Sequence, residues 1–219
     1  AHVAACIREW QETVDYGLST PLLLSPQFIY DNRRKQYNNQ WLPLTGMLSH
    51  DVVKILQKDG IVEEIFWKYR GSFDNLDGLT DSEKKVKEKQ ARIPSEIRKL
   101  AKNFRINSYF GISSVSELIH ALVNHGPVFI GTNLYHFGKI GTTMTGPAEH
   151  NRIWAPAPGF TEKLADGDSH SAHALTIVGF NDLTIDAEGI LNGNFVVRNS
   201  WGKKWGDSFI SLGSTHNLG

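Results

Sequence analysis

Cysteine is nearly absent from the chain: its 219 residues include one, Cys6. No disulfide can therefore form within these residues, and the cysteine pairs of many zinc sites are missing. The histidines show no zinc-binding spacing, and no glycine-rich phosphate loop follows an apolar strand pattern. We therefore expect no metal and no other cofactor.

An excess of charge and a long apolar run are also lacking. The chain carries 23 basic and 23 acidic residues, so its formal net charge is zero. Neither nucleic acid nor an anionic membrane is thus indicated as a partner. No apolar run reaches the roughly 18–20 residues of a membrane span. The length suffices for one large domain or two small ones with a substantial core.

Helical periodicity is present in several stretches, the first being residues 1–16. The apolar stripe of this first helix consists of Val3, Cys6, Ile7, Trp10 and Val14. Serine caps are expected at Ser25, Ser49, Ser95 and Ser114, and glycine stops at Gly17, Gly60 and Gly126. The helix after Ser114 has a capping box with Glu117, and its inward-facing residues are Leu118, Ile119, Ala121 and Leu122.

Residues 81–104 are rich in lysine and arginine, with acidic residues interleaved. We interpret them as two solvated helices separated at Pro94. A basic binding face is the alternative, and the interleaved acidic residues count against it.

The most informative stretch runs from Ser169 to Gly206, after a predicted buried strand at residues 127–134. His173 opens one β-branched run and Asn199 closes the next. If the runs form a hairpin, the two residues face each other. The amide oxygen can then accept the proton of one ring nitrogen and leave the other to act on a nucleophile. The alternative is a core histidine and an asparagine that ends a strand.

These runs resemble a known family. The segment from His173-Ala to Val178-Gly-Phe180, followed by Asn199-Ser-Trp-Gly-Lys-Lys-Trp-Gly206, is similar to the C-terminal half of papain-like (C1-type) cysteine peptidases. That family cleaves peptide bonds with a Cys-His-Asn arrangement. The resemblance implies that His173 is the general base and ion-pair partner of the thiol, that Asn199 orients it, and that Trp201 covers the pair.

The resemblance also locates the nucleophile. In the family a central helix, with the nucleophile at its N-terminal end, precedes a Leu-Ser-x-Gln segment, which Leu24-Ser-Pro-Gln27 matches. Counting back, with Glu9 at the acidic position of the helix, places the nucleophile about two residues before Ala1. We expect the 219 residues to begin just after the catalytic cysteine. The oxyanion-hole glutamine lies further upstream.

Cys6 is the fallback nucleophile. It lies about two helical turns, roughly 10 Å, further along the helix. The alternative is a buried structural thiol, because a cysteine inside a helix lacks the free N–H groups that lower the pKa of a thiol.

Two further positions match substrate-binding positions of the family. Gly46 corresponds to a glycine whose backbone pairs with an extended substrate, although a plain turn glycine is an equal alternative. Ala174 matches a position that lines the pocket for the second substrate side chain before the cut. Its small side chain would leave that pocket roomy.

The predicted fold class is α+β, a single papain-like domain over residues 1–219 with two lobes. The helical lobe covers about residues 1–104, and the β-rich lobe, an antiparallel sheet closing toward a barrel, about 105–219. The implied function is a cysteine-type endopeptidase that works through an acyl-enzyme. The alternatives are an inactive peptide-binding homologue and a thiol amidase or acyltransferase.

The implied partner is a polypeptide in an extended conformation, with a pro-segment or a protein inhibitor as further partners and a monomer as the expected state. Animal and plant members usually carry several disulfides. Their absence favours a bacterial secreted or cytoplasmic protein over a disulfide-bonded lysosomal one and leaves the compartment open.

Overall fold

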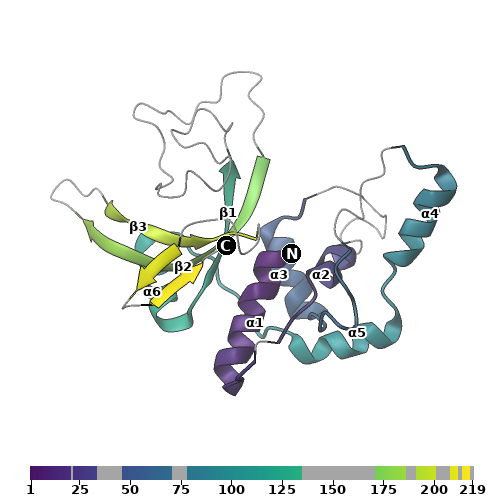
Figure 1. Cartoon of the computed structure of the whole chain (residues 1–219), viewed down its shortest axis with the longest axis horizontal. Coiled ribbons are helices and arrows are strands. Elements are labelled where there is room, and N and C mark those ends of the chain that lie inside the picture. The colour runs from purple at the N-terminus through teal and green to yellow at the C-terminus, as the bar shows by residue number, and fades with distance from the viewer. Residues whose placement is uncertain are drawn as a thin grey trace. The chain divides into compact units, whose positions relative to one another are not determined.

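The computed structural model of the protein describes residues 1–20, 22–33, 46–70, 78–134, 171–185, 191–200, 208–211 and 214–217 (Figure 1). The chain forms two compact units, Ala1–Gly111 and Ile112–Gly219. Helices make up the first unit, and all strands of the described residues belong to the second. The α+β class predicted from the sequence is therefore confirmed.

The first unit is built from five helices and a 3-10 turn within its described residues. They are α1 (His2–Tyr16), α2 (Pro26–Asn32), α3 (Ser49–Lys58), α4 (Asp81–Gln90), α5 (Ser95–Ala101) and η2 (Lys102–Phe104).

Helix α1 ends as the sequence predicts. Gly17 adopts a left-handed backbone conformation (φ 60°, ψ 35°), and its N–H donates to a carbonyl of the last turn. The predicted apolar stripe is only partly right: Val3 is buried, whereas Val14 is 56% exposed. The reason is that the buried apolar residues of α1 all lie in its first turn. Further along, the buried side chain is Glu12, which pairs with Arg8 one turn earlier.

The start of α2 is fixed by the cap that the sequence predicts. Ser25 Oγ accepts an N–H of the first turn at 3.0 Å, and Pro26 occupies the first helical position. The same hydroxyl donates to the carbonyl of Trp67. From α1, the Glu9 carboxylate accepts the backbone N–H of Leu24 at 2.7 Å. Two distant segments therefore hold this corner of the chain.

Helix α3 does not use the cap that was predicted for it. Ser49 is its first helical residue, and the extended Leu48 occupies the cap position without a side-chain bond. The backbone N–H groups of Asp51 and Val52 donate to the Leu48 carbonyl. The Asp51 carboxylate also lies at the positive end of the helix dipole. The start of α3 is thus stabilised by the Leu48 carbonyl and by the Asp51 carboxylate, without a serine side chain. The predicted cap at Ser49 is wrong.

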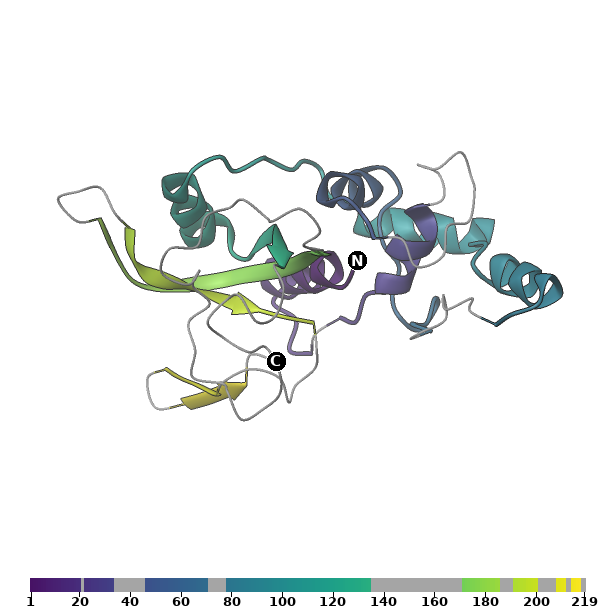
Figure 2. The ribbon, with the colours of Figure 1, turned by 90° about the horizontal axis from the view of Figure 1, so that it is seen from above.

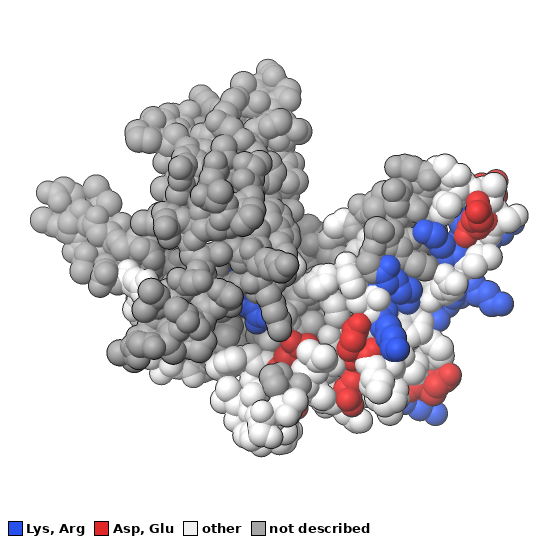
Figure 3. All heavy atoms as spheres, viewed as in Figure 1, with Lys and Arg blue, Asp and Glu red and all other residues white. Residues whose placement is uncertain are grey.

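Helix α4 is stabilised by its cap rather than by packing, since none of its 10 residues is buried. The Thr80 hydroxyl accepts the Glu83 N–H at 3.3 Å, and the Glu83 carboxylate accepts the Thr80 N–H at 2.8 Å. Acidic and basic side chains alternate over this part of the surface (Figure 3). The interpretation as a solvated helix is confirmed for α4. In α5, Ala101 is buried, and Pro94 occupies the cap position without a side-chain bond, so the predicted cap at Ser95 is wrong.

The second unit contains a three-stranded antiparallel sheet in the order β1 (Val128–Leu134), β2 (Ser171–Ile185) and β3 (Leu191–Arg198). A separate antiparallel pair consists of β4 (Ser208–Ser211) and β5 (Ser214–Asn217). The predicted strand at 127–134 is confirmed as β1, but its predicted burial is wrong, since Val128, Phe129 and Ile130 are only half-buried. The predicted pairing of the two later runs is confirmed. Closure toward a barrel stays a prediction.

Helix α6 (Val115–His125) packs against β1 and β2 (Figure 2). Ser114 accepts the Glu117 N–H at 3.1 Å as predicted, whereas the Glu117 carboxylate returns a bond to the N–H of Ser113 at 2.7 Å. Gly126, at φ 86°, ends the helix. The four apolar residues predicted to face inward are half-buried, so the stripe of α6 is confirmed.

A glycine packs against the backbone of a core residue in the first unit. Phe28, Val62, Ile93 and Ala101 form this core. Gly60, with φ 80°, follows α3, and a Cβ atom there would overlap with the carbonyl group of Ala101. Both the backbone conformation and the close approach therefore require glycine.

We expect Gly60→Ala to lower the free energy of unfolding by about 3 kcal/mol, because the methyl group must push the backbone apart at a φ that strains an L residue. Gly17→Ala is the matched control, with the same class of φ and no atom within 4 Å of the new Cβ. It should cost about 1 kcal/mol. Urea unfolding followed by circular dichroism measures both. Equal losses would show that the Ala101 carbonyl does not constrain position 60.

Candidate active site

His173 and Asn199 meet through the register of two strands. Thr176 of β2 pairs with Arg198 of β3. Continuing this register places Asn199 opposite Leu175, which makes His173 its diagonal neighbour on the same face of the sheet. His173 Nε2 lies 2.9 Å from Asn199 Oδ1. His173 is half-buried, and Asn199 is 3% exposed.

A backbone group fixes which way the amide of Asn199 points. The N–H of Ser200 donates to Asn199 Oδ1 at 2.7 Å. A backbone N–H can only donate, so the atom that faces it must be the amide oxygen. His173 Nε2 meets the same oxygen and must therefore be the donor in its own contact. In the neutral ring, the proton lies on Nε2 and Nδ1 is the basic nitrogen.

The other end of the Asn199 amide is also informative. Asn199 Nδ2 is buried and has no hydrogen-bond partner among the residues that the structure describes. Among the described residues, the oxygen is therefore the end of the amide that makes contacts, and both the His173 ring and the Ser200 N–H point toward it.

The remaining predicted site residues lie in different parts of the chain. Ala174, half-buried, follows the histidine on β2 and pairs with Gly131 of β1. Gly46 is exposed, just before α3, with no atom within 4 Å of a Cβ built on it. Cys6 is half-buried inside α1. Trp201 lies outside the described residues.

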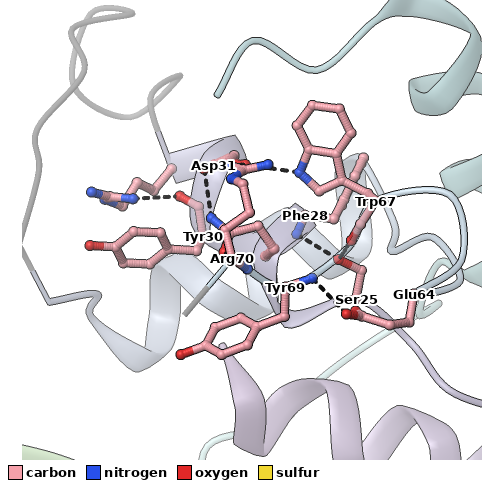
Figure 4. A network of polar contacts seen from close by, with 10 residues as sticks. Ser25, Phe28, Tyr30, Asp31, Glu64, Trp67, Tyr69 and Arg70 are labelled. Carbon is pink, nitrogen blue, oxygen red and sulfur yellow. Dashed lines mark hydrogen bonds and ion pairs between the residues drawn. The ribbon is translucent and has the colours of Figure 1, made fainter. Parts of the chain in front are cut away.

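The first unit contains a polar cluster around a buried carboxylate that the sequence did not reveal. It is here called the Asp31 network and consists of Gln27, Asp31, Trp67 and Arg70; Figure 4 shows Asp31, Trp67 and Arg70. The Asp31 carboxylate accepts Gln27 Nε2 at 3.0 Å and Trp67 Nε1 at 2.8 Å, and it pairs with the Arg70 guanidinium. Burial raises the pKa of Asp31, although the charge of Arg70 and the donated hydrogen bonds act in the opposite direction.

In the described part of the chain, no group of three or more His, Cys, Asp or Glu side chains could hold a metal ion. No helix in that part is long and apolar enough to cross a membrane.

Comparison with known proteins identifies the family of this chain. The profile of a family described as "Papain family cysteine protease" matches residues 18–217, which is most of the chain. The chain therefore belongs to the papain family of cysteine proteases, and the family inferred from the His173 and Asn199 motifs is confirmed.

Two solved structures are similar to this chain. Xylellain, a cysteine protease from Xylella fastidiosa, is 23% identical with a TM-score of 0.65, over 93% of this chain and 68% of that one. A structure from work on antibody cross-reactivity between the mite allergens Blo t 1 and Der p 1 is 17% identical with a TM-score of 0.46, over 94% and 55%. No curated protein matches the chain. The likeness to xylellain confirms the papain-like fold.

We expect nitrogen NMR of the neutral His173 ring to show a protonated Nε2 and an unprotonated Nδ1, because Asn199 Oδ1 can only accept. Asn199→Asp keeps an acceptor oxygen and should keep this tautomer. Asn199→Ala removes the oxygen and should give a mixture of tautomers. A wild-type ring protonated on Nδ1 would contradict the assigned direction of the hydrogen bond.

Asp31 should make stability depend on pH. Its folded-state pKa lies above its ordinary value of 3.8, so the folded state holds the proton more tightly than the unfolded chain. Its contribution to stability is complete below pH 3.8 and is lost as the pH rises through the folded-state pKa. The stability of the wild type relative to Asp31→Asn, measured by denaturant unfolding across pH, should therefore fall over that interval. A difference that grows with pH would refute this sign.

Proposed function

We propose that the protein is a cysteine-type peptidase that hydrolyses peptide bonds through an acyl-enzyme, with His173 as the acid–base residue and Asn199 as its orienting partner. The observation that carries the proposal is the 2.9 Å contact between His173 Nε2 and Asn199 Oδ1. It makes Nδ1 the nitrogen that exchanges protons with the thiol and with the leaving group.

We propose that the thiol belongs to a cysteine about two residues before Ala1, as the family match implies. Contact between the matching segments supports this count, since Glu9 accepts the N–H of Leu24. A thiol at the start of a helix is favoured as a thiolate by the helix dipole and by free N–H groups. Cys6, inside α1, lacks this advantage.

In the proposed reaction the thiolate sulfur attacks the carbonyl carbon of the scissile peptide bond. Protonated His173 gives its Nδ1 proton to the leaving amine as the C–N bond breaks, and the acyl group remains on sulfur as a thioester. Water then attacks the thioester and gives a proton back to Nδ1. The carboxylic acid leaves, and the thiolate and imidazolium are restored.

Substrate positions follow from the same family match and are part of the proposal. The substrate is a polypeptide in an extended conformation, which pairs with the backbone at Gly46. Ala174 borders the pocket for the second side chain before the cut. Trp201 covers the His173–Asn199 pair and keeps water from it. The oxyanion is stabilised by the backbone N–H of the catalytic cysteine and by a glutamine further upstream.

We expect the full-length protein, with the residues that precede Ala1, to be labelled by a thiol-directed inhibitor and to cleave peptides. His173→Ala should abolish labelling and lower kcat/KM by about 100-fold or more, because acid–base catalysis is lost. Cys6→Ala is the matched control and should change neither readout. Peptide mapping of the labelled protein identifies the reactive thiol.

Three results would overturn the proposal. Labelling at Cys6 that is lost in Cys6→Ala would place the nucleophile inside α1. Peptide binding without turnover would favour an inactive peptide-binding homologue. Amide exchange without peptide hydrolysis would favour a thiol amidase or acyltransferase.

A further inference from the structure

The Asp31 network holds a short segment, Trp67–Arg70, against α2. Trp67 Nε1 and the Arg70 guanidinium both bind Asp31, whose side chain has no exposed surface. The backbone N–H of Arg70 donates to Gln27 Oε1 at 3.3 Å. At the other end of the segment, the carbonyl of Trp67 accepts the hydroxyl of Ser25. Both ends are therefore tied to α2 or to its cap residue Ser25.

Tyr69 lies between these tied ends and is itself held. Its backbone N–H donates to Glu64 Oε1 at 2.6 Å (Figure 4). Its side chain is 50% exposed, so core burial does not fix the ring. The position of the ring thus depends on a backbone that is held at residues 67, 69 and 70 by the network and by Glu64.

The Tyr69 ring contacts the beginning of α1. Its centroid lies 4.9 Å from the centroid of the His2 ring, with the two planes at 79°, which is edge-to-face packing. His2 is the first residue of α1, and no side chain caps this end of the helix among the described residues. Val3 is buried next to it. The first turn of α1 is thus held by core packing and by the Tyr69 ring.

We propose that Asp31 and Tyr69 are positioning residues that set the place of the first turn of α1, and with it the thiol assigned to the residues before that turn. The proposal rests on the proposed function in one respect, namely that the group positioned by this turn is the catalytic thiol. The contacts run from Asp31 through Arg70 and Trp67 to the backbone of Tyr69, and from its ring to His2. A thiol displaced by about 1 Å can lose up to 100-fold in rate, so small shifts of this turn matter.

The test compares variants that keep or remove one link. Tyr69→Phe keeps the ring, whereas Tyr69→Leu removes it. Asp31→Asn removes the buried charge. Trp67→Phe removes the Nε1–H donor together with part of a ring that packs against the core, and it gives a second variant of the network if Asp31→Asn does not fold. Asp81→Asn is the matched control, because it makes the same chemical change in an exposed aspartate that pairs with Lys84 at 3.9 Å.

The first readout is the chemical shift of the His2 ring protons in the full-length protein, assigned with His2→Gln, because the Tyr69 ring current displaces them. We expect Tyr69→Phe and Asp81→Asn to keep the wild-type shift. Tyr69→Leu, Asp31→Asn and Trp67→Phe should move it toward the value of an exposed histidine. The His2 shift reports only on residues that the structure describes, and it can be measured whether or not the protein is catalytically active.

The second readout is the rate of thiol labelling across pH. Tyr69→Leu and Asp31→Asn should each slow it about 10- to 100-fold, Tyr69→Phe should restore it, and the double variant should be no slower than the worse single one. Unchanged His2 shifts in Tyr69→Leu, or additive rate effects, would overturn the positioning role. Wild-type protein that no thiol reagent labels would overturn the proposed function instead, while the His2 shifts still decide the contact.

Discussion

One amide oxygen carries the chemistry assigned to this chain. Asn199 Oδ1 receives the Ser200 N–H and faces the ring of His173. A peptide N–H cannot reverse its role, whereas an asparagine amide and an imidazole both can. The Ser200 N–H therefore fixes the orientation of the Asn199 amide. The amide oxygen in turn fixes the position of the proton on the neutral His173 ring. The backbone at the end of β3 thus determines that Nδ1 is the ring nitrogen without a proton in the neutral histidine.

Local rules explain most of what the sequence predicted correctly. The caps at Ser25 and Ser114 and the stop at Gly17 depend on neighbours within one turn, so the residues alone reveal them. The His173–Asn199 contact spans 26 residues but follows from hairpin geometry, which is also a repeating local rule.

The features that the sequence did not reveal depend on tertiary packing. The Asp31 network joins residues 36 and 39 apart, and no periodicity links an aspartate in one helix to a distant tryptophan and arginine. Nor could the stripe of α1 show that its buried apolar residues lie only in the first turn, since this depends on what the helix packs against. The Ser200 contact could have been suspected, because asparagine side chains often bind nearby backbone groups.

Family membership and residue roles rest on different kinds of evidence. The match over residues 18–217 fixes the class of protein and its fold. The roles proposed for His173 and Asn199 come from the family resemblance, and the 2.9 Å contact between the two side chains supports them. The two lines meet at the same residues, which is why the proposed chemistry is specific about atoms while the substrate is described only by its backbone.

Helices α2 and α4 differ in how many of their residues are buried. In α2, five of seven residues are buried, namely Gln27, Phe28, Ile29, Asp31 and Asn32. In α4 none of the 10 is buried, and only the Thr80–Glu83 cap fixes its start. Divergence among homologues should therefore gather in α4 and leave α2 nearly untouched. The same contrast makes α4 a suitable place to attach a fluorophore or an affinity tag without disturbing the fold.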